Sequence, residues 1–471
     1  MNNFHLEIFL IKIDLEILYY LIDNFFINIF NIIFLEIDLI NSVPESPTVA
    51  LETHGCKLNQ ADTLKLIGEF EKNGVKVVDL DENPNFYVLN SCTVTHIADR
   101  KARQSLRAAK KRNPNSIVVA SGCYAERAKD DLLKLEEIDF VFGNTEKHQI
   151  VSKILNHFSS RNIPKSTYDN VLKISSEKLR TRAMVKIQEG CDQICSYCIV
   201  PIVRGRERSL HPRVIIENIQ RLVDSGFKEV VLTGTQLGTY GFDLNDVDLT
   251  SLIKKILQET SVTRLRVSSI QAHEIDSNLL KLWENDRLCS HFHVPLQSGS
   301  NQILKMMRRR YSIQEYISSI RMIYEHVESP TITTDVIVGY PGETDNDFEE
   351  SKTLCEDLDF LKLHVFKYSD RFKTSSYYDK NKIPSESKSN RANILRTISR
   401  SHWNSFADKS YGKVEEVLWE KSENIQGKYY WSGYTKNYLK VYFDQDLDLA
   451  NSISQVSLDK RIRDKIFAKP I

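Results

Sequence analysis

The chain has 471 residues, which is too long for one ordinary domain and predicts about three. Its 41% hydrophobic and 27% charged residues are typical of globular proteins and exclude a disordered, collagen-like or coiled-coil chain. The 63 basic side chains (Lys and Arg) balance 63 acidic ones, so a surface that binds nucleic acid has to be a local basic patch. Eight cysteines are too dilute for a disulfide scaffold, and their clustering indicates metal ligands.

The N-terminal residues differ from the rest, because residues 1–40 are a low-complexity run of Ile, Leu, Phe and Asn. The stretch from Ile17 to Leu35 is long enough to span a bilayer, but an ionised Asp23 inside it would cost about 2.5–3.5 kcal/mol. Acidic flanks and the lack of a basic start and a small-residue cleavage site argue against an oriented span and a secretory signal. We interpret residues 1–45 as an extension of unknown role, with a membrane anchor as the alternative.

Residues 48–150 alternate short apolar strands with polar helical stretches, which predicts an α/β domain with a parallel sheet. Strands are expected at 48–51, 75–78, 86–89 and 117–120, and helices at 61–72 and 98–111. Cys56, Cys92 and Cys123 each follow a predicted strand. Because ligand sites of parallel sheets form at the carboxyl ends of the strands, we expect these three thiols at one edge.

Residues 150–180 are polar and are expected to be a connector, after which the alternation of strands and helices resumes. Six strand–helix units between residues 184 and 375 predict a partial (β/α)6 barrel with its chemistry at the carboxyl ends of the strands. Its strands are expected at 184–187, 230–233, 265–268, 291–294, 333–338 and 361–366. From residue 410, apolar and polar residues alternate around Gly and Asn turns over residues 414–419, 428–433 and 438–443, which predicts a small β module. The expected domains are therefore 46–160, 177–409 and 410–471.

The strongest local motif is a Cys-x3-Cys-x2-Cys loop directly after a predicted strand, formed by Cys191, Cys195 and Cys198. Three thiolates leave one iron of a 4Fe-4S cluster open to a small molecule. Zinc is the alternative, but structural zinc sites need four ligands and usually contain paired Cys-x2-Cys knuckles. The spacing therefore favours a 4Fe-4S cluster, over which Tyr197 would pack.

This loop, with an aromatic residue before its last cysteine, resembles the signature of radical S-adenosylmethionine enzymes. The resemblance implies that the open iron chelates S-adenosylmethionine. It also implies that an electron from the cluster cleaves the cofactor to a 5′-deoxyadenosyl radical, which abstracts hydrogen from an unreactive C–H bond. An electron donor of the flavodoxin or ferredoxin type is implied as well.

The sequence around each upstream cysteine indicates which family within this superfamily the chain resembles. The three strings are Thr53-His-Gly-Cys56-Lys-Leu-Asn-Gln-Ala-Asp62, Asn90-Ser-Cys92-Thr-Val-Thr and Ser121-Gly-Cys123-Tyr-Ala-Glu126. They resemble the N-terminal motifs of the methylthiotransferases, whose cysteines hold a second 4Fe-4S cluster. That domain, the radical barrel and a TRAM-like RNA-binding module are expected in this order. We call Cys56, Cys92 and Cys123 the first triplet, and Cys191, Cys195 and Cys198 the second triplet.

Two clusters suit the reaction of this family, which replaces an aromatic C–H by C–S–CH3. The cluster of the second triplet would generate the radical, and that of the first triplet (the auxiliary cluster) would deliver sulfur obtained from a separate source. S-adenosylmethionine would serve as methyl donor and as radical source.

Glycine-rich strings at predicted strand ends suggest contacts with S-adenosylmethionine. The residues expected to make these contacts are Tyr197, Gly234, Gln297 and Gly339. The alternative is that the glycines belong to ordinary tight turns. His54 and His96 flank ligand cysteines and are either donors to the ligands or solvated histidines. Cys289 and Cys355 lie outside both triplets and are expected to be core thiols.

Several strings resemble the branch of the family that modifies N6-threonylcarbamoyladenosine beside the tRNA anticodon. They include Val185-Lys-Ile-Gln-Glu-Gly-Cys191, Met306-Met-Arg-Arg-Arg-Tyr311 and the stretch from Thr93 to Gln104. The helix that follows Cys92 is strongly basic and is expected to contact phosphates of the anticodon arm, although a solvated helix face is the alternative. Its predicted RNA contacts are Arg100, Lys101, Arg103, Lys110, Lys111 and Arg112, and Arg204, Arg206 and Arg208 are expected to extend this strip.

The resemblance implies a cytoplasmic enzyme without a stable protein partner. Two sister branches are alternatives, acting on isopentenyladenosine in tRNA or on an aspartate of a ribosomal protein. An alternative of another class is a non-enzymatic iron–sulfur protein that binds RNA. One string departs from the family, because Phe366-Lys-Tyr-Ser-Asp-Arg-Phe-Lys-Thr374 lacks the Pro and Gly expected after the last barrel strand.

Overall fold

The computed structural model describes residues 46–159, 181–445 and 447–471. The chain divides into two compact units, and residues 48–152 and 170–471 form the one that holds nearly all described residues. The other unit comprises residues 1–47 and 153–169. The candidate membrane span of residues 17–35 and most of the expected connector lie outside the described residues. Within the described part of the chain, no helix is long and apolar enough to cross a membrane.

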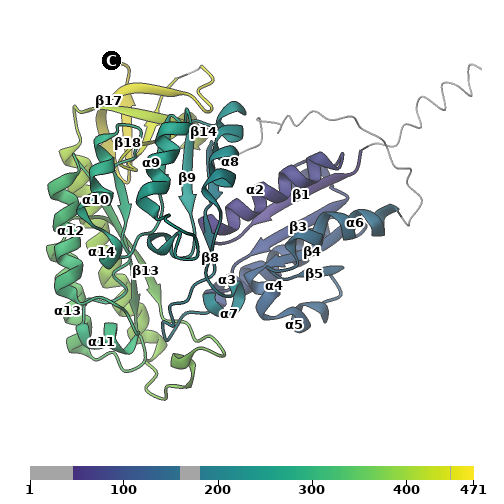
Figure 1. Ribbon diagram of the computed structural model, residues 1–471, viewed down its shortest axis with the longest axis horizontal. Coiled ribbons are helices and arrows are strands. Elements are labelled where there is room, and N and C mark those ends of the chain that lie inside the picture. Colours follow the sequence, from purple (N-terminus) through teal and green to yellow (C-terminus); the bar gives the residue numbers. More distant parts are fainter. Residues whose placement is uncertain (1–45, 160–180, 446) are drawn as a thin grey trace, which may run out of the picture. The chain divides into compact units, whose positions relative to one another are not determined.

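The N-terminal part is an α/β domain built on a five-stranded parallel sheet in the order β2-β1-β3-β4-β5 (Figure 1). Its strands are β1 (Thr48–Thr53), β2 (Lys76–Val77), β3 (Phe86–Ser91), β4 (Ile117–Gly122) and β5 (Phe140–Phe142). Its helices are α2 (Lys57–Lys72), α3 (His96–Arg112), α4 (Cys123–Arg127), α5 (Lys129–Leu133) and α6 (Ile150–Ser159). Every residue of β3 and β4 is buried, as expected for central parallel strands covered on both faces.

The strands and helices predicted for this part are confirmed, with boundaries shifted by a few residues. The expected connector is wrong at its start, because residues 150–159 form α6. This helix is amphipathic, and the apolar side chains of Ile150, Val151 and Ile154 are buried.

Six parallel strands follow, in two three-stranded sheets of the orders β10-β9-β6 and β11-β12-β13. The strands are β6 (Arg182–Lys186), β9 (Glu229–Thr233), β10 (Arg264–Val267), β11 (His291–His293), β12 (Thr331–Val338) and β13 (Phe360–Lys367). Single parallel bridges, Leu265 to Leu288 and Ser269 to His293, join the two sheets. All six predicted strands are confirmed, and their order in space is their order in the chain.

Helices and a short antiparallel pair connect these strands (Figure 1). The helices are α7 (Val200–Arg204), α8 (Pro212–Asp224), α9 (Leu249–Glu259), α10 (Ser277–Leu280), α11 (Asn301–Met306), α12 (Ile313–His326) and α13 (Asp345–Asp357). The pair consists of β7 (Gln188–Glu189) and β8 (Arg208–Ser209). Alternate strand residues such as Val230, Leu232 and Leu265 pack against the helices in one large core. The residues between them, among them Glu229 and Arg266, face the opposite side of the sheets.

The C-terminal part is a closed five-stranded barrel in the order β14-β15-β16-β18-β17. Its strands are β14 (Val414–Ile425), β15 (Lys428–Thr435), β16 (Lys440–Phe443), β17 (Ile453–Ile462) and β18 (Lys465–Lys469). The fully buried Trp419 stacks on Phe443 at its centre, with ring centroids 5.5 Å apart. A long helix, α14 (Ser385–Lys409), precedes the barrel and packs on β13. The sequence predicted β14, β15 and β16 but neither β17, β18 nor α14.

Candidate functional site

The first triplet lies at the carboxyl edge of the N-terminal sheet. Cys56 caps the N-terminus of α2 after β1, Cys92 follows β3, and Cys123 is the first residue of α4 after β4. Because β1, β3 and β4 are adjacent and parallel, the three thiols emerge at one edge, as the sequence predicted.

Asn59 of α2 marks how close the thiols of this triplet lie to one another. Its Oδ1 atom is 3.9 Å from the Sγ atom of Cys56 and 3.9 Å from the Sγ atom of Cys123. Burial, together with the charges of Cys123 and Cys56, raises the pKa of the Cys92 thiol to about 12. Three thiols from three loops therefore face one small volume.

Local backbone geometry presents these thiols. Gly122 has φ +94, and a Cβ atom there would lie 2.5 Å from the backbone oxygen of Ser91, so only glycine allows the turn that leads into Cys123. The backbone N–H of Val94 points at Cys92 Sγ from 3.5 Å, and Asn144 Nδ2 lies 3.6 Å from Cys123 Sγ. Such N–H donors stabilise thiolate ligands of iron–sulfur clusters.

The donor set of each triplet fits a cluster better than a single ion. Among the described residues, no group of three or more His, Cys, Asp or Glu side chains converges to hold one metal ion. The cysteines of a 4Fe-4S cluster each bind a different iron, so their sulfur atoms need to surround a volume without meeting at one point. Three thiols at one sheet edge meet that requirement.

The second triplet lies in the loop between β7 and α7. The carbonyl oxygen of Gln193 is 4.0 Å from Cys191 Sγ, and its side-chain Oε1 is 4.0 Å from Cys195 Sγ. Burial raises the pKa of Cys191 to about 11 and that of Cys198 to about 12. The loop is thus folded around Gln193, and the charges of Cys195 and Cys191 also raise the pKa of Cys198, so the three thiols lie close together.

A half-buried arginine that sequence reasoning did not single out reaches the second triplet. Arg309 donates through Nη1 toward Cys195 Sγ at 3.4 Å and through Nη2 to Gln271 Oε1 at 2.7 Å. Its guanidinium also lies over the ring of Tyr311, 5.0 Å from the centroid. The sequence contained Arg309 only inside a string of three arginines, and nothing in that string indicates which of them turns inward.

Helix α7 connects the two triplets. It begins two residues after Cys198, and Ile199 and Val203 pack against Cys123 in one buried cluster. Asn144, whose Nδ2 atom lies near Cys123 Sγ, also donates to the carbonyl oxygen of Val203 at 2.6 Å. At about 1.5 Å per residue, a helix of five residues spans roughly 7 Å, so the two cysteine loops are near neighbours.

The expectation that Arg204 contacts phosphate is wrong. Its side chain is 2% exposed, and it donates to Glu189 Oε1 at 2.7 Å and to Asn59 Oδ1 at 2.5 Å. Arg206 and Arg208 remain on the surface, with side chains 85% and 57% exposed. A run of alternating arginines carries no signal that distinguishes the buried member.

The residues expected to contact S-adenosylmethionine lie near the second triplet or at strand ends. Tyr197 meets Tyr340 edge-on, with ring centroids 6.5 Å apart. Gly234 follows β9, and Gly339 follows β12 and donates to Glu343 Oε2 at 2.6 Å. Gln297 donates its backbone N–H to the carbonyl oxygen of Asp335 at 2.8 Å. Their role as cofactor contacts stays a prediction.

The remaining histidines and cysteines have structural surroundings. His54 Nε2 pairs with Glu52 Oε1 at 2.7 Å, and His96 is exposed at the start of α3. Cys289 and Cys355 are fully buried, which confirms them as core thiols.

Helix α3 begins beside the first triplet, with Thr95 Oγ1 accepting the N–H of Ala98 at 3.2 Å. Three of its predicted RNA contacts already have partners, namely Arg103 with Tyr124, Lys110 with Asp139 and Arg112 with Asp81. Arg100, Lys101 and Lys111 are exposed and form no ion pair with any described residue. The helix therefore carries free cations at both ends.

The loop after β13, where the sequence departs from the family, contacts the start of α3. Arg371 donates to Asp99 Oδ2 at 2.7 Å, and both side chains are buried. Ser369 Oγ accepts the backbone N–H of His96 at 3.2 Å. The departing string thus holds the segment that follows Cys92.

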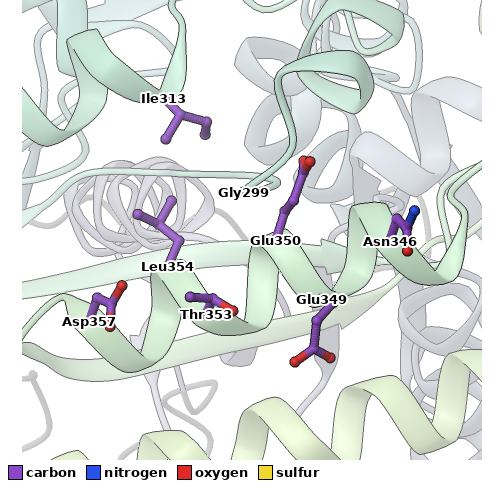
Figure 2. A pocket seen from close by; sticks show the side chains of 8 residues that line it. All are labelled: Gly299, Ile313, Asn346, Glu349, Glu350, Thr353, Leu354 and Asp357. Atoms are coloured by element: carbon purple, nitrogen blue, oxygen red, sulfur yellow. The ribbon is translucent and has the colours of Figure 1, made fainter.

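A groove elsewhere on the molecule contains Gly299, which lies two residues after the predicted cofactor contact Gln297, but no predicted site residue. Figure 2 shows its lining, which consists of Gly299, Ile313, Asn346, Glu349, Glu350, Thr353, Leu354 and Asp357. Its carboxylates would repel phosphates, so it does not suit RNA. Gly299 lies against α13, because a Cβ atom there would come within 2.4 Å of Ser351 Cα.

Two family models match the chain. Residues 48–143 match the uncharacterized protein family UPF0004, and residues 185–355 match the radical SAM superfamily. The first match contains the first triplet, and the second match contains the second triplet.

Curated relatives cover most of the chain. A protein of Aquifex aeolicus named threonylcarbamoyladenosine tRNA methylthiotransferase MtaB is 39% identical, over 79% of this chain and 92% of its own. A protein of the same name from Bacillus subtilis is 33% identical, over 88% and 94%. A tRNA-2-methylthio-N(6)-dimethylallyladenosine synthase of Clostridium perfringens is 32% identical, over 87% and 94%.

Solved structures share the fold. The radical S-adenosylmethionine methyltransferase TsrM from Kitasatospora setae, solved with cobalamin and a [4Fe-4S] cluster, aligns with a TM-score of 0.51. The alignment covers 70% of this chain and 77% of that one at 15% identity. At this identity the likeness concerns the fold alone.

Proposed function

Because the chain belongs to the radical S-adenosylmethionine methylthiotransferases of the MtaB type, we propose that it methylthiolates C2 of N6-threonylcarbamoyladenosine at position 37 of tRNA. The chain is an enzyme, and its family uses S-adenosylmethionine and 4Fe-4S chemistry. The proposal adds the number of clusters, the division of work between them and the modified base.

The observation that carries the proposal is the junction of the two triplets through α7. Replacing C–H by C–S–CH3 needs a group that removes hydrogen and a group that delivers sulfur to the same carbon. Two three-cysteine sites, separated by one short helix and packed on each other through Cys123, Ile199 and Val203, support this pairing.

In this proposal each triplet supplies three ligands to its own 4Fe-4S cluster. The bound cluster and S-adenosylmethionine supply the radical chemistry at the second triplet. The chain holds Cys195 under the guanidinium of Arg309 and orders the loop around Gln193. The Cys92 loop is held through Asp99, which binds Arg371 and Arg127. These contacts orient the two ligand sets before substrate arrives.

Polar side chains on β11, β12 and β13 support the threonylcarbamoyl branch. His293 Nε2 lies 3.3 Å from Asp335 Oδ2, and the rings of His293 and His364 are 5.6 Å apart. Burial is the main cause that lowers the pKa of His364, and the charge of Lys57 lowers it further. Lys57 is the neighbour of Cys56, so these histidines lie near the first triplet. A polar surface of hydrogen-bonding histidines beside Lys57 and the first triplet suits the polar threonylcarbamoyl substituent better than an apolar isopentenyl group.

The two triplets and the C-terminal barrel lie in three successive parts of the chain, to which we assign separate roles. We assign residues 46–160 to the auxiliary cluster, 177–409 to a partial (β/α)6 radical barrel and 410–471 to a TRAM-like RNA-binding module. The exposed Tyr429 on β15 gives the last module an aromatic surface for RNA stacking. The tRNA anticodon arm is the proposed partner, with an external electron donor and a sulfur source, in the cytoplasm.

Mass spectrometry of tRNA nucleosides from cells with and without this gene tests the proposed substrate. In cells without the gene, we expect loss of 2-methylthio-N6-threonylcarbamoyladenosine and accumulation of N6-threonylcarbamoyladenosine without the methylthio group. Loss of the methylthio form of isopentenyladenosine would assign the chain to that branch. Unchanged tRNA with an unmodified ribosomal-protein aspartate would indicate the protein-modifying branch.

A separate assay addresses the non-enzymatic alternative. The reduced chain with reconstituted clusters should cleave S-adenosylmethionine to 5′-deoxyadenosine. A chain that binds RNA and carries iron but forms no 5′-deoxyadenosine would be a binding protein.

A further inference from the structure

Arg204 belongs to the segment of the second triplet, but its guanidinium faces the first. It is the last residue of α7, the helix that begins just after Cys198. Its Nη2 atom donates to Asn59 Oδ1 at 2.5 Å, and that oxygen lies 3.9 Å from the sulfur atoms of both Cys56 and Cys123. The guanidinium is therefore one amide group away from two ligands of the auxiliary cluster.

The surroundings of Arg204 leave an unbalanced positive charge. Nη2 also lies 3.2 Å from Asp62 Oδ2, and Nη1 lies 2.7 Å from Glu189 Oε1. Asp62 in turn binds Lys147 at 2.6 Å and Lys186 at 2.7 Å. Lys186 also pairs with Glu189 at 3.0 Å, and the more exposed Arg208 does so at 3.4 Å. Four cations thus share two carboxylates, and positive charge is in excess beside the first triplet.

Burial makes this charge effective. The side chains of Arg204 and Asp62 are 2% and 4% exposed, so water screens the network weakly. Burial alone would raise the pKa of Asp62, but Lys147, Lys186 and Arg204 hold it well below its ordinary value. The carboxylate therefore stays ionised. Burial lowers the pKa of Lys147, but burial of Lys186 is outweighed by Asp62 and Glu189, which raise its pKa. Even without a charge on Lys147, the cations Arg204, Lys186 and Arg208 outnumber the two carboxylates.

We propose that Arg204 is a positioning residue for the auxiliary cluster, and that its buried charge raises the reduction potential of this cluster. The inference rests on the proposed cluster at the first triplet. One-electron reduction adds a negative charge to a thiolate-bound cluster, and a fixed cation nearby stabilises the reduced form. The loop that carries the radical-generating cysteines therefore also sets the electrostatics of the sulfur-delivering site.

The test measures the auxiliary cluster alone. The full chain with Cys191, Cys195 and Cys198 replaced by Ala is reconstituted anaerobically and titrated with dithionite, and the reduced cluster is followed by EPR. Arg204→Gln should shift the midpoint potential to a more negative value. Arg204→Lys keeps the charge and should leave the potential closer to that of the parent.

A second variant keeps the test decisive if Arg204→Gln does not fold. Asn59→Asp retains an acceptor for Arg204 and places a negative charge between the guanidinium and the two thiols, so it should also lower the potential. Arg213→Gln is the matched control, because Arg213 is 82% exposed and pairs with Glu217 on the surface of α8. It should leave the potential unchanged. An unchanged potential in either Arg204→Gln or Asn59→Asp would overturn the proposal.

The reciprocal background separates this proposal from the two-cluster assignment. With Cys56, Cys92 and Cys123 replaced by Ala, Arg204→Gln should leave the potential of the remaining cluster unchanged, and a comparable shift there would contradict the inference. If the chain without the second triplet holds no iron at all, the proposed auxiliary cluster fails. If it holds a cluster whose midpoint potential is the same with and without Arg204→Gln, only the proposed role of Arg204 fails.

Discussion

The thiols of the first triplet differ in accessibility, whereas those of the second triplet are all half-buried, and burial has a consequence for cluster assembly. Cys56 is exposed, whereas Cys92 and Cys123 are buried. Burial raises the pKa of Cys92 to about 12 and that of Cys198 to about 12, so these thiols hold their protons in the metal-free chain. Iron binds thiolates, and cluster formation therefore has to release these protons.

Iron content tests the ligand assignment at this scale. If each triplet holds one 4Fe-4S cluster, anaerobic reconstitution should load about eight irons per chain. Replacing Cys191, Cys195 and Cys198 by Ala should halve this number, as measured by iron and sulfide analysis. The buried Cys355 offers a matched control, because Cys355→Ala should leave the iron content unchanged. A triple variant that loads as much iron as the parent would refute the assignment.

Single cysteine variants test the division of labour. Cys92→Ala should still form 5′-deoxyadenosine from S-adenosylmethionine but should lose methylthiolation, because sulfur delivery is assigned to the first triplet. Cys198→Ala should lose both reactions. Product analysis by liquid chromatography and mass spectrometry measures them side by side. Loss of cleavage in Cys92→Ala while the other cluster is intact by EPR would show that the two sites cannot be separated.

At the scale of elements, α3 joins the cluster edge to a basic surface. Its N-terminus lies beside Cys92, and Asp99 in its first turn binds Arg127 and Arg371. An acidic side chain in the first turn also suits the partial positive charge of the helix N-terminus. The helix is anchored at its start by ion pairs to the buried Asp99, and it exposes the unpaired cations Arg100, Lys101 and Lys111 near its two ends.

Salt dependence distinguishes the free cations of α3 from the paired ones. Replacing Arg100, Lys101 and Lys111 by Ala should weaken tRNA binding and reduce the slope of log K against log salt by about one for each lost phosphate contact. Replacing Lys110 and Arg112, which pair with Asp139 and Asp81, should reduce the slope less. Fluorescence anisotropy at several salt concentrations gives both slopes.

Neither α3 variant should change uncoupled cleavage of S-adenosylmethionine, because the helix does not contact the second triplet in our proposal. Equal affinities and slopes for the parent and the Arg100, Lys101 and Lys111 variant would move the RNA surface away from α3. The C-terminal barrel would then be the next surface to test.

At the scale of the whole molecule, buried ion pairs join segments that lie far apart in the sequence. Asp62 of α2 pairs with Lys186 of β6, and Arg182 at the start of β6 pairs with Glu420 of β14 at 2.7 Å. Arg266 of β10 binds Glu229 and donates to the carbonyl oxygen of Lys436 at 3.0 Å. Breaking a buried pair leaves an uncompensated charge, so these contacts define one arrangement of the strands they connect.

His364 of β13 makes the stability of the cluster-free chain depend on pH. Burial lowers the pKa of His364 to about 4, with Asp335 opposing the shift. The unfolded chain therefore binds a proton at His364 below about pH 6.5, and the folded chain does so only near pH 4. The free energy of unfolding should fall as the pH falls through this window, by up to about 1.4 kcal/mol per pH unit for one proton.

Urea unfolding of the metal-free, reduced chain at several pH values measures this slope. His364→Gln should flatten the pH dependence between about pH 4 and 6.5, because the unfolded variant no longer takes up this proton. His326, which is exposed, provides the control, and His326→Gln should retain the slope of the parent. An equal slope in the parent and His364→Gln would show that His364 does not titrate differently on folding.

Most of the α/β architecture was predictable because its signals are local. The buried strands β3 and β4 are continuous apolar runs, and the cysteines stand directly after them. Helix α14 was missed because its few apolar residues, such as Leu395 and Ile398, are widely spaced among polar ones, and contact with β13 stabilises it. Strands β17 and β18 were missed because alternation is weak there and only closure of the barrel pairs them.

The sequence by itself determined the two sets of cysteine ligands, because spacing within a loop and position after a strand are properties of neighbouring residues. Only the tertiary structure decided what faces those ligands. Arg204, Arg206 and Arg208 are equivalent by composition, but the packing of α7 on Cys123 buries the first and leaves the others in solvent. Arg309 likewise reaches Cys195 from a distant segment. Long-range packing decides which arginine side chain of such a run is buried, and the local sequence pattern does not contain this information.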